Sequence, residues 1–326
     1  MILAIETSCD DTCAALVSAD GAILANVISS QEAHSRFGGV VPEVAARAHI
    51  ELIEPVISEA FARASASLED VELVAATRGP GLVGALLVGF STAKAFAAAR
   101  ELPFAAVDHL AGHVAGAYLR PACFEPPFVA LIASGGHTLL LAVRDRAAAP
   151  DVLARTLDDA AGEAFDKGAR MLGLGYPGGA ALERLARDGD PQAYDFPSGR
   201  GADFSFAGLK TALLYRTREV DLEDERTRAD LAASYQRAIV EGLVRRAAHA
   251  LEQTGLRRLA LGGGVAANGV LRARLEELGV ELFLPPLELC TDNAAMIASA
   301  AADVTPLPYP DYLDLDVYAT GEGPLR

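Results

Sequence analysis

The strongest constraint on the fold is a pattern of short apolar runs that occurs twice along the chain. Three such runs separated by polar or glycine turns predict a meander of three strands. The first set occupies residues 2–5, 13–17 and 22–28, and the second, about 125 residues later, occupies residues 128–133, 138–143 and 152–157. Helical periodicity follows each set, and strands that alternate with helices indicate a sheet covered on both faces. We therefore predict an α/β protein built from a duplicated unit.

The length of 326 residues, 51% of them hydrophobic, is sufficient for two domains of ordinary size. We place the N-terminal subdomain at residues 1–122 and the C-terminal subdomain at residues 123–304. Residues 305–326 then form a separate tail. Because the tail is rich in proline and acidic residues, we expect it to be loosely packed or disordered.

The charge of the chain and the pattern of its apolar residues bear on whether it binds nucleic acid or a membrane. The 28 basic and 44 acidic residues give a net charge of −16, so most of the surface should repel nucleic acid. The first residues do not resemble a secretory signal, which makes the cytoplasm the expected location. The most apolar window, residues 81–99, is interrupted by Lys94 and follows a Gly-Pro-Gly turn, so we predict a buried helix and no membrane partner.

A candidate metal site comes from residues far apart in the sequence. His109 and His113 are four residues apart, and on a helix this spacing brings both imidazoles to one face. Asp292 is the best third ligand by its chemistry, although its position before an apolar helix is also typical of an N-cap. Two nitrogens and a carboxylate, with further positions open, would suit iron or zinc acting as a Lewis acid.

Three glycine-rich turns are candidates for binding a nucleotide. Residues 262–264 connect a predicted strand to a helix that begins near Asn268, where backbone amides can approach an anion or a ribose hydroxyl. Residues 134–138 and 176–179 are two further flexible turns. Tight turns needed only for folding are the alternative interpretation. Together with the polar turn at residues 6–12, however, these segments predict a cleft between two domains.

Other polar residues have simpler interpretations from the sequence alone. Asp166 has Arg170 four residues later, which is typical of a solvated ion pair. Lys210 is better explained as a surface lysine than as a phosphate ligand. His49 and His137 have no evident partners, and the sequence assigns them no role.

Nine motifs, in order over residues 1 to about 303, closely resemble the bacterial type of the TsaD/Kae family. They are ETSCDDT at 6–12, GGVVPE at 38–43, GPGL at 79–82, the histidines at 109 and 113, SGGHT at 134–138, GEAFDK at 162–167, YPGG at 176–179, GGVAAN at 263–268 and TDNA at 291–294. This resemblance implies the actin, hexokinase and Hsp70-like (ASKHA) fold, with two subdomains around a nucleotide cleft.

The resemblance also implies the reaction of a tRNA N6-adenosine threonylcarbamoyltransferase. In that reaction, L-threonylcarbamoyl-AMP donates its threonylcarbamoyl group to the exocyclic amine of an adenosine. The acceptor lies 3′ of the anticodon in tRNAs that read ANN codons, and the products are N6-threonylcarbamoyladenosine and AMP. The family further implies a TsaB-like paralogue and a TsaE-like ATPase as partners, so we expect the isolated chain to be weakly active or inactive.

Carried over residue by residue, the resemblance assigns His109, His113 and Asp292 as ligands of one divalent metal ion, with Fe²⁺ preferred and Zn²⁺ as the alternative. The positions that match the family's adenylate site are Ile132, Ala133, Ser134, Gly135, Gly136, Asp166, Gly179, Glu183 and Asn268. Asp10 or Asp11 is our hypothesis for the group that orients the amine or accepts its proton. Ala207 departs from the family, which commonly has serine there, and the tail lacks the basic-aromatic ending of some members.

Three other functions compete with this interpretation. A metallopeptidase would explain the histidine pair, but Leu110 stands where such zinc enzymes have their glutamate base. An ATP-dependent small-molecule carbamoyltransferase sharing this fold would usually carry an additional domain. A noncatalytic paralogue would have no need of both histidines and Asp292.

Overall fold

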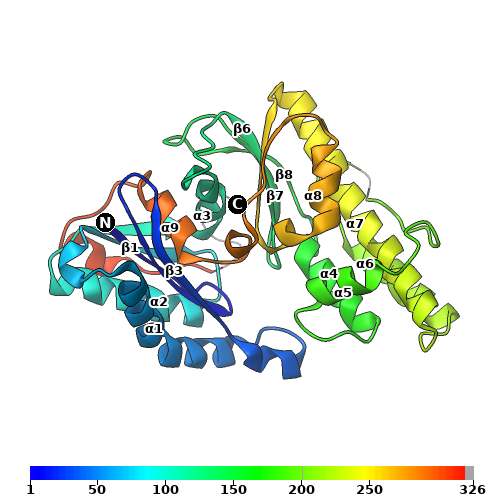
Figure 1. The fold of residues 1–326 in the computed structure, drawn as a ribbon, viewed down its shortest axis with the longest axis horizontal. Helices are drawn as coiled ribbons and strands as arrows, with labels where there is room; N and C mark the ends of the chain where they lie inside the picture. Colours follow the sequence, from blue (N-terminus) through cyan, green and yellow to red (C-terminus); the bar gives the residue numbers. More distant parts are fainter. Residues whose placement is uncertain (200, 320–326) are drawn as a thin grey trace. The chain divides into compact units, whose positions relative to one another are not determined.

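The computed structural model describes residues 1–199 and 201–319, which fold into two compact units. Unit 1 comprises Met1–Glu125 together with the segment that begins at Asp292, and unit 2 is Pro126–Thr291. Each unit contains one five-stranded sheet surrounded by helices (Figure 1).

The two sheets have the same topology. In unit 1 the strand order is β3-β2-β1-β4-β5, and in unit 2 it is β10-β9-β6-β7-β8. The strands of unit 1 are β1 (Ile2–Glu6), β2 (Asp11–Val17), β3 (Ile23–Ser30), β4 (Leu73–Gly79) and β5 (Phe104–Asp108). Those of unit 2 are β6 (Phe128–Ala133), β7 (Thr138–Val143), β8 (Asp151–Arg155), β9 (Arg258–Gly262) and β10 (Glu281–Phe283). Each sheet is an antiparallel meander extended by two parallel strands, which confirms the duplicated α/β unit.

The helices are distributed between the units as follows. Unit 1 has α1 (Pro42–Ala64), α2 (Val83–Ala99), α3 (His109–Ala115) and α9 (Ala294–Ala301), and unit 2 has α4 (Ala161–Met171), α5 (Gly178–Ala186), α6 (Ala207–Glu219), α7 (Glu225–Thr254) and α8 (Gly269–Glu276). Short 3₁₀ turns are η1 (Glu32–Phe37), η2 (Leu68–Asp70), η3 (Gly116–Tyr118), η4 (Gly264–Ala267), η5 (Leu287–Leu289) and η6 (Asp311–Asp314).

Alternate side chains of a strand point to opposite faces of the unit 1 sheet, and the two faces contact different helices. Leu3 and Ile5 of β1 belong to a core cluster with Ile53 of α1 and Phe90 of α2. The opposite side of β1 and β2 packs against α9. Helix α2 buries one face, which includes Leu86 and Phe90, and exposes the other, so the window predicted as buried is half-buried. Within the described residues, no helix is both long and apolar enough to cross a membrane.

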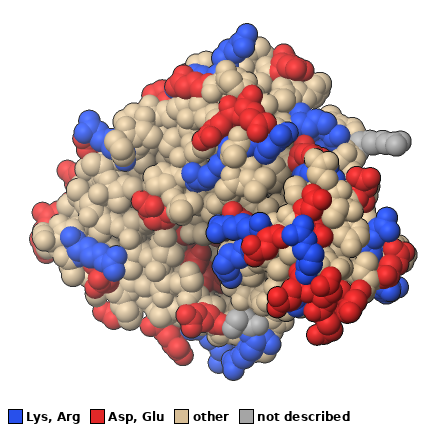
Figure 2. Space-filling model, turned by 45° about the vertical axis from the view of Figure 1, so that its right-hand side comes forward, with Lys and Arg blue, Asp and Glu red and all other residues tan. Residues whose placement is uncertain are grey.

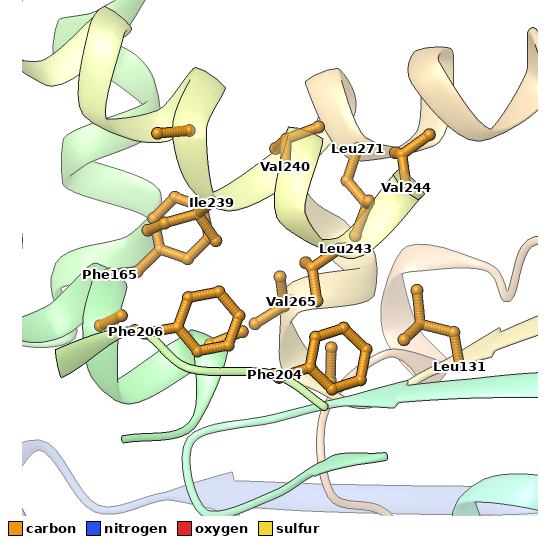
Figure 3. Close-up of a cluster of buried hydrophobic side chains, with 14 of the residues drawn as sticks. Leu131, Phe165, Phe204, Phe206, Ile239, Val240, Leu243, Val244, Val265 and Leu271 are labelled. Atoms are coloured by element: carbon orange, nitrogen blue, oxygen red, sulfur yellow. The ribbon is translucent and has the colours of Figure 1, made fainter. Parts of the chain in front are cut away.

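The core of unit 2 is dominated by the long helix α7. Figure 3 shows Ile239 and Leu243 of this helix in the cluster that also contains Phe204 and Phe206. These two rings stack with centroids 6.2 Å apart and planes inclined by 12°. Leu131 of β6 belongs to the same cluster, so α7 is fixed to the sheet that carries the predicted adenylate turn.

The chain returns to unit 1 earlier than the sequence analysis placed the domain boundary. We expected the second subdomain to end at residue 304, but Asp292 and all of α9 belong to unit 1. The physical reason is that α9 is buried on all sides and almost entirely apolar, with Ala295 and Ile297 fully buried, and it packs against α3 and the sheet of unit 1.

The prediction of a loose tail is wrong for its described part, residues 305–319. Leu307 forms an antiparallel bridge with Phe104 of β5, and the Tyr312 side chain is fully buried with its ring 5.2 Å from that of Phe104. Lys94 donates to the carbonyl oxygens of residues 313 and 315, at 3.1 Å and 2.9 Å. Composition suggested disorder, but spaced apolar residues let this segment join the core. Residues 320–326 lie outside the described part of the chain.

Candidate metal centre and nucleotide-binding turns

Helix α3 begins at the first histidine because the preceding residue caps it. The Oδ1 atom of Asp108, the last residue of β5, accepts hydrogen bonds from the backbone N–H groups of Leu110 (2.9 Å) and Ala111 (3.0 Å). This is the standard way to satisfy the free amides of a first helical turn. His109 and His113 therefore sit one turn apart, and both are nearly buried.

Asp292 meets both imidazoles. Its Oδ1 atom lies 3.5 Å from Nε2 of His109 and 3.3 Å from Nε2 of His113. The planes of the two rings are inclined by 77°, and their centroids are 4.7 Å apart. The cap of α9 is Asn293, whose side chain accepts from the backbone N–H of Met296 at 3.0 Å. Capping is thus done by the next residue, and Asp292 faces the histidine pair.

The three side chains fit a divalent cation. One potential ligand atom from each lies within 4.8 Å of the others. Two atoms bound at about 2.1 Å from one tetrahedral ion are roughly 3.4 Å apart, which matches the separations between Asp292 and each imidazole. Moreover, Nε2 of His113 is buried and has no hydrogen-bond partner among the described residues. A buried nitrogen of this kind normally requires a partner, and a metal ion would provide one.

Glu6 orients His109, a role that the sequence analysis did not assign. Nδ1 of His109 donates to Oε2 of Glu6 at 2.9 Å, and the fully buried carboxylate also accepts from the Ser8 amide and the Thr77 hydroxyl. A carboxylate behind a histidine directs the other ring nitrogen toward a metal. The signal in the sequence was a charged residue at the end of an apolar strand, since a carboxylate buried there needs donors.

The electrostatics of the site favour positive charge. Burial acts to lower the pKa of His109, but Asp292 and Glu6 together raise it to about 9. Burial acts to raise the pKa of Glu6, but the charge and hydrogen bond of His109 outweigh it and lower this pKa. Two carboxylates around buried imidazoles therefore form a negative environment in which a cation is stabilised.

The turn that carries Asp10 and Asp11 is held by His49, for which the sequence suggested no role. Nε2 of this buried histidine donates to the carbonyl of Cys9 at 3.0 Å, and its Nδ1 is 2.8 Å from the Thr12 hydroxyl. Burial raises the pKa of Asp11 to about 7, and the charges of Asp292 and Asp10 add to this rise. A pKa near neutrality suits a proton acceptor. The assignment of either aspartate to catalysis stays a prediction.

We expect Asp11→Asn to stabilise the metal-free protein at pH 8. In the folded protein the pKa of Asp11 is about 7 against an ordinary value of 3.8. Ionisation therefore disfavours folding, increasingly between these two values and fully above the higher one. The gain should be absent near pH 3.5, grow with pH and level off above pH 7, at no more than about 4 kcal/mol. Denaturant unfolding at several pH values measures it, and a gain independent of pH would contradict the assignment.

The same turn is pressed against α2 at a glycine. The Thr7 hydroxyl donates to the carbonyl of Ala85 at 2.9 Å and accepts from the amide of Gly89 at 3.2 Å. A Cβ atom on Gly89 would lie 2.3 Å from that hydroxyl oxygen and 3.1 Å from Cγ2 of Ile5. The β-branched Thr7 has few rotamers with which to move away.

Gly89→Ala should consequently lower stability by about 2–3 kcal/mol through overpacking and the loss of these hydrogen bonds. Gly84→Ala is the matched control in the same helix, because among the described residues its Cβ would meet only Cβ of Ala46, at 3.4 Å. We expect the control to be unchanged or slightly stabilised, since alanine favours a helix. Equal melting temperatures for the two variants would show that the turn is not held in this way.

In unit 2, two of the predicted adenylate turns lie against other backbone segments. Gly162, in the first turn of α4, donates its N–H to the carbonyl of Ser134 at 3.0 Å, and a Cβ there would lie 2.7 Å from that oxygen. Gly263 has a φ of +88°, and a Cβ there would lie 2.4 Å from the carbonyl oxygen of Ala133. Gly135 and Gly136 are open, because no described atom lies within 4 Å of the place that a Cβ would take. The turn that follows Ile132 is thus fixed at its base and free at its tip.

The remaining predicted adenylate positions gather around the first turns of α5 and α8: Gly179 and Asn268 lie at these helix starts, and the Asp166 and Glu183 carboxylates contact them. Asp166 accepts from the amides of Gly178 (2.8 Å) and Gly179 (3.2 Å), at the start of α5. Glu183 accepts from the amide that begins α8 at 3.0 Å. Asn268 caps α8 and donates to Gln236 of α7 at 2.8 Å. Hydrogen bonds therefore connect these positions through α4, α5, α7 and α8, all within unit 2.

Lys210 is not an isolated surface lysine. Its Nζ lies 2.9 Å from one carboxylate oxygen of Asp159, and Nζ of Lys167 lies 2.9 Å from the other. Lys167 also pairs with Glu163 at 2.8 Å. The sequence could not reveal this arrangement, because Asp159 and Lys210 are 51 positions apart and only folding brings them together.

Comparisons with known proteins agree with the fold and the motifs. The model of the TsaD family, described as tRNA N6-adenosine threonylcarbamoyltransferase, matches residues 22–299. A protein of that name from Bordetella petrii is 52% identical over 316 residues, covering 93% of this chain and 90% of the relative. One from Symbiobacterium thermophilum is 51% identical over 308 residues, covering 92% and 90%.

Two solved structures share the fold at low sequence identity. Component A of (R)-2-hydroxyglutaryl-CoA dehydratase from Acidaminococcus fermentans is 17% identical, with a TM-score of 0.57 over 93% of this chain and 96% of its own. HypF of T. kodakarensis is 14% identical, with a TM-score of 0.62 over 92% of this chain and 47% of its own. These similarities concern the fold alone.

The duplicated sheets and the structural neighbours define an α/β protein of the actin, hexokinase and Hsp70-like class, as predicted. Within that class, the chain belongs to the TsaD family of tRNA N6-adenosine threonylcarbamoyltransferases. Membership of a transferase family favours the main interpretation over a metallopeptidase or a small-molecule carbamoyltransferase. The family and the His-His-Asp cluster are together consistent with a bound divalent metal.

Proposed function

We propose that this chain transfers the threonylcarbamoyl group from L-threonylcarbamoyl-AMP to the N6 amine of the adenosine 3′ of the anticodon in tRNAs that read ANN codons. The observation that carries the proposal is the family match over most of the chain in a protein that has the buried His109 and His113 beside the half-buried Asp292. The expected site of the reaction is the cytoplasm, where tRNA is present.

In this reaction the amine nitrogen forms a bond with the carbamoyl carbon, and the bond from that carbon to the AMP phosphate oxygen breaks. AMP leaves with the electron pair, and the attacking nitrogen loses one proton. Negative charge therefore develops first on the carbamoyl oxygen and then on the phosphate, and groups that stabilise it there accelerate the step. We assign the acceptance of the proton, or the orientation of the amine, to Asp10 or Asp11.

We assign His109, His113 and Asp292 as the protein ligands of one divalent ion, Fe²⁺ in preference to Zn²⁺. An ion bound there would act as a Lewis acid and stabilise the developing negative charge. Glu6 keeps the His109 ring in the orientation that directs Nε2 toward the ion. The nearly buried imidazoles limit the access of water to the ligand atoms, which strengthens their electrostatic interactions.

We assign the adenylate to unit 2, at positions Ile132 to Gly136, Asp166, Gly179, Glu183 and Asn268. Support comes from the open space around Gly135 and Gly136 at the tip of the Ser134 turn and from the hydrogen bonds that connect the other positions within unit 2. Backbone amides at a glycine turn with open space around it are suited to a phosphate. The Asp166 and Glu183 carboxylates maintain the turns by accepting backbone hydrogen bonds.

Capture of tRNA should depend on partner proteins. The net charge is −16, and Figure 2 shows basic side chains interspersed with acidic ones over the displayed face rather than forming one broad basic surface. Affinity for nucleic acid comes mainly from many phosphate contacts with Lys and Arg. We therefore propose that a TsaB-like paralogue and a TsaE-like ATPase complete the active assembly.

The test is a reconstituted reaction. Purified protein loaded with Fe²⁺ or Zn²⁺ is incubated with threonylcarbamoyl-AMP and unmodified tRNA, with and without the two partners, and the nucleosides are analysed by mass spectrometry. We expect N6-threonylcarbamoyladenosine in the complete mixture and a large reduction when a chelator is present. A complete, metal-loaded mixture that leaves adenosine unmodified would contradict the proposed function.

A further inference from the structure

Residues 316–318, close to the end of the described chain, lie against the ends of β4 and β5, just before helix α3. Nε of Arg78 donates to the carbonyl of Asp316 at 2.7 Å, and the Tyr318 amide donates to the carbonyl of Arg78 at 3.1 Å. The Arg78 guanidinium carbon also lies 5.9 Å from the centroid of the Tyr318 ring. One backbone hydrogen bond and a cation–π contact thus fix Tyr318 at the end of β4, and the Arg78 side chain also holds the carbonyl two residues earlier.

Tyr318 is linked directly to the residue that starts α3. Its hydroxyl donates to Oδ2 of Asp108 at 2.6 Å. The other oxygen of the same carboxylate, Oδ1, accepts the two amide hydrogen bonds that cap α3. Because a carboxylate is rigid and planar, holding one oxygen restricts the position of the other. The tyrosine therefore contributes to the geometry of the cap one residue before His109.

The end of β4 is shaped for this tyrosine. Gly79 is paired in register with Asp108, and it has a φ of +152°. A Cβ on Gly79 would lie 2.4 Å from the Tyr318 carbonyl oxygen and 2.6 Å from Cδ2 of its ring. Any side chain at this position would expel Tyr318, so the glycine is what allows the contact with Asp108.

We propose that Tyr318 is a positioning residue for the metal centre, acting through Asp108 to hold α3 so that His109 and His113 face Asp292. The part that concerns metal binding rests on the proposed function. The part that concerns the order of α3 does not, because it depends only on hydrogen bonds within unit 1.

The first test measures α3 in the metal-free, full-length protein. Tyr318→Phe removes only the hydroxyl, and the amides of Leu110 and Ala111 should then exchange with solvent roughly tenfold faster, which corresponds to about 1.4 kcal/mol. Tyr309→Phe is the matched control, because this tyrosine of the same segment is 42% exposed and makes no hydrogen bond with α3 in the described structure. Unchanged exchange in the Tyr318 variant would overturn the proposal.

The second test measures the affinity for Co²⁺ by its absorption spectrum. We expect Tyr318→Phe to weaken binding about 3- to 10-fold and to alter the visible bands, with Tyr309→Phe like the wild type. In an Asp108→Ala background, Tyr318→Phe should have no further effect, because the two residues act as one unit. If the two substitutions weakened Co²⁺ binding additively, the proposal that Tyr318 acts through Asp108 would be overturned. If the wild type itself bound no Co²⁺, the metal proposal would fail, and amide exchange would still decide the role of Tyr318 in ordering α3.

Discussion

Replacement of His113 by alanine should reduce threonylcarbamoyl transfer by at least about 100-fold while the protein stays folded. His113 is the cleaner of the two histidines to test. His109 also binds Glu6 and Ser8, so its loss would disturb the neighbouring turn, whereas Nε2 of His113 has no hydrogen-bond partner within the described residues and faces Asp292 at 3.3 Å. The variant removes one proposed ligand and leaves the hydrogen bond between His109 and Glu6 in place.

The measurement is the single-turnover rate in the complete reconstituted reaction, together with metal content and the circular dichroism spectrum. His249→Ala is the matched control, because this exposed histidine lies on α7 in unit 2. It should behave like the wild type. A His113 variant that retains both its metal and the wild-type rate would exclude the imidazole as a ligand and would remove the basis of the proposed chemistry.

Gly263→Ala should produce the largest loss of stability that we expect in unit 2, at least about 3 kcal/mol. Its φ of +88° combines with a ψ of 163°, a conformation that is essentially restricted to glycine. In addition, the new Cβ would lie 2.4 Å from the Ala133 carbonyl oxygen and 2.7 Å from its carbon. Those are backbone atoms of β6, so relief requires a shift of the strand end that leads into the Ser134 turn.

Gly264→Ala is the adjacent control. Among the described residues, no atom lies within 4 Å of the place that its Cβ would take, and its φ is not in the left-handed region. Thermal unfolding should show an apparent Tm roughly 6–12 °C lower for the Gly263 variant and little changed for the Gly264 variant. Similar Tm values for both would mean that the approach of the loop to β6 is not as close as the structure describes.

Much of the fold could be predicted because it depends on local patterns. The two meanders follow from alternating runs and turns, which are properties of a few neighbouring residues. The His109 and His113 pair follows from the helical period alone. The choice of Asp292 as third ligand required the family resemblance, since locally it looked like a helix cap. The structure gives that capping role to Asn293.

The predictions that failed depended on contacts between distant residues. The composition of residues 305–319 resembled a disordered tail, but Tyr312 and Leu307 meet Phe104, which is about 200 positions earlier in the sequence. His49 and Glu6 were given no roles because their partners are set by the packing of α1 and β4 against the first turn. A sequence pattern does not contain such contacts, since they arise only when the elements are packed.

By itself, the sequence determined the duplicated α/β architecture, the histidine pair and the family, because these depend on residue types and short spacings along the chain. The tertiary structure alone decided that Asp292 faces both imidazoles, that Glu6 orients one of them, and that Tyr318 holds the cap of α3. The physical reason is that a buried charge is stable only beside a partner of suitable direction and distance. Folding brings those partners together from segments far apart in the sequence, such as Asp108 and Tyr318, which are 210 positions apart.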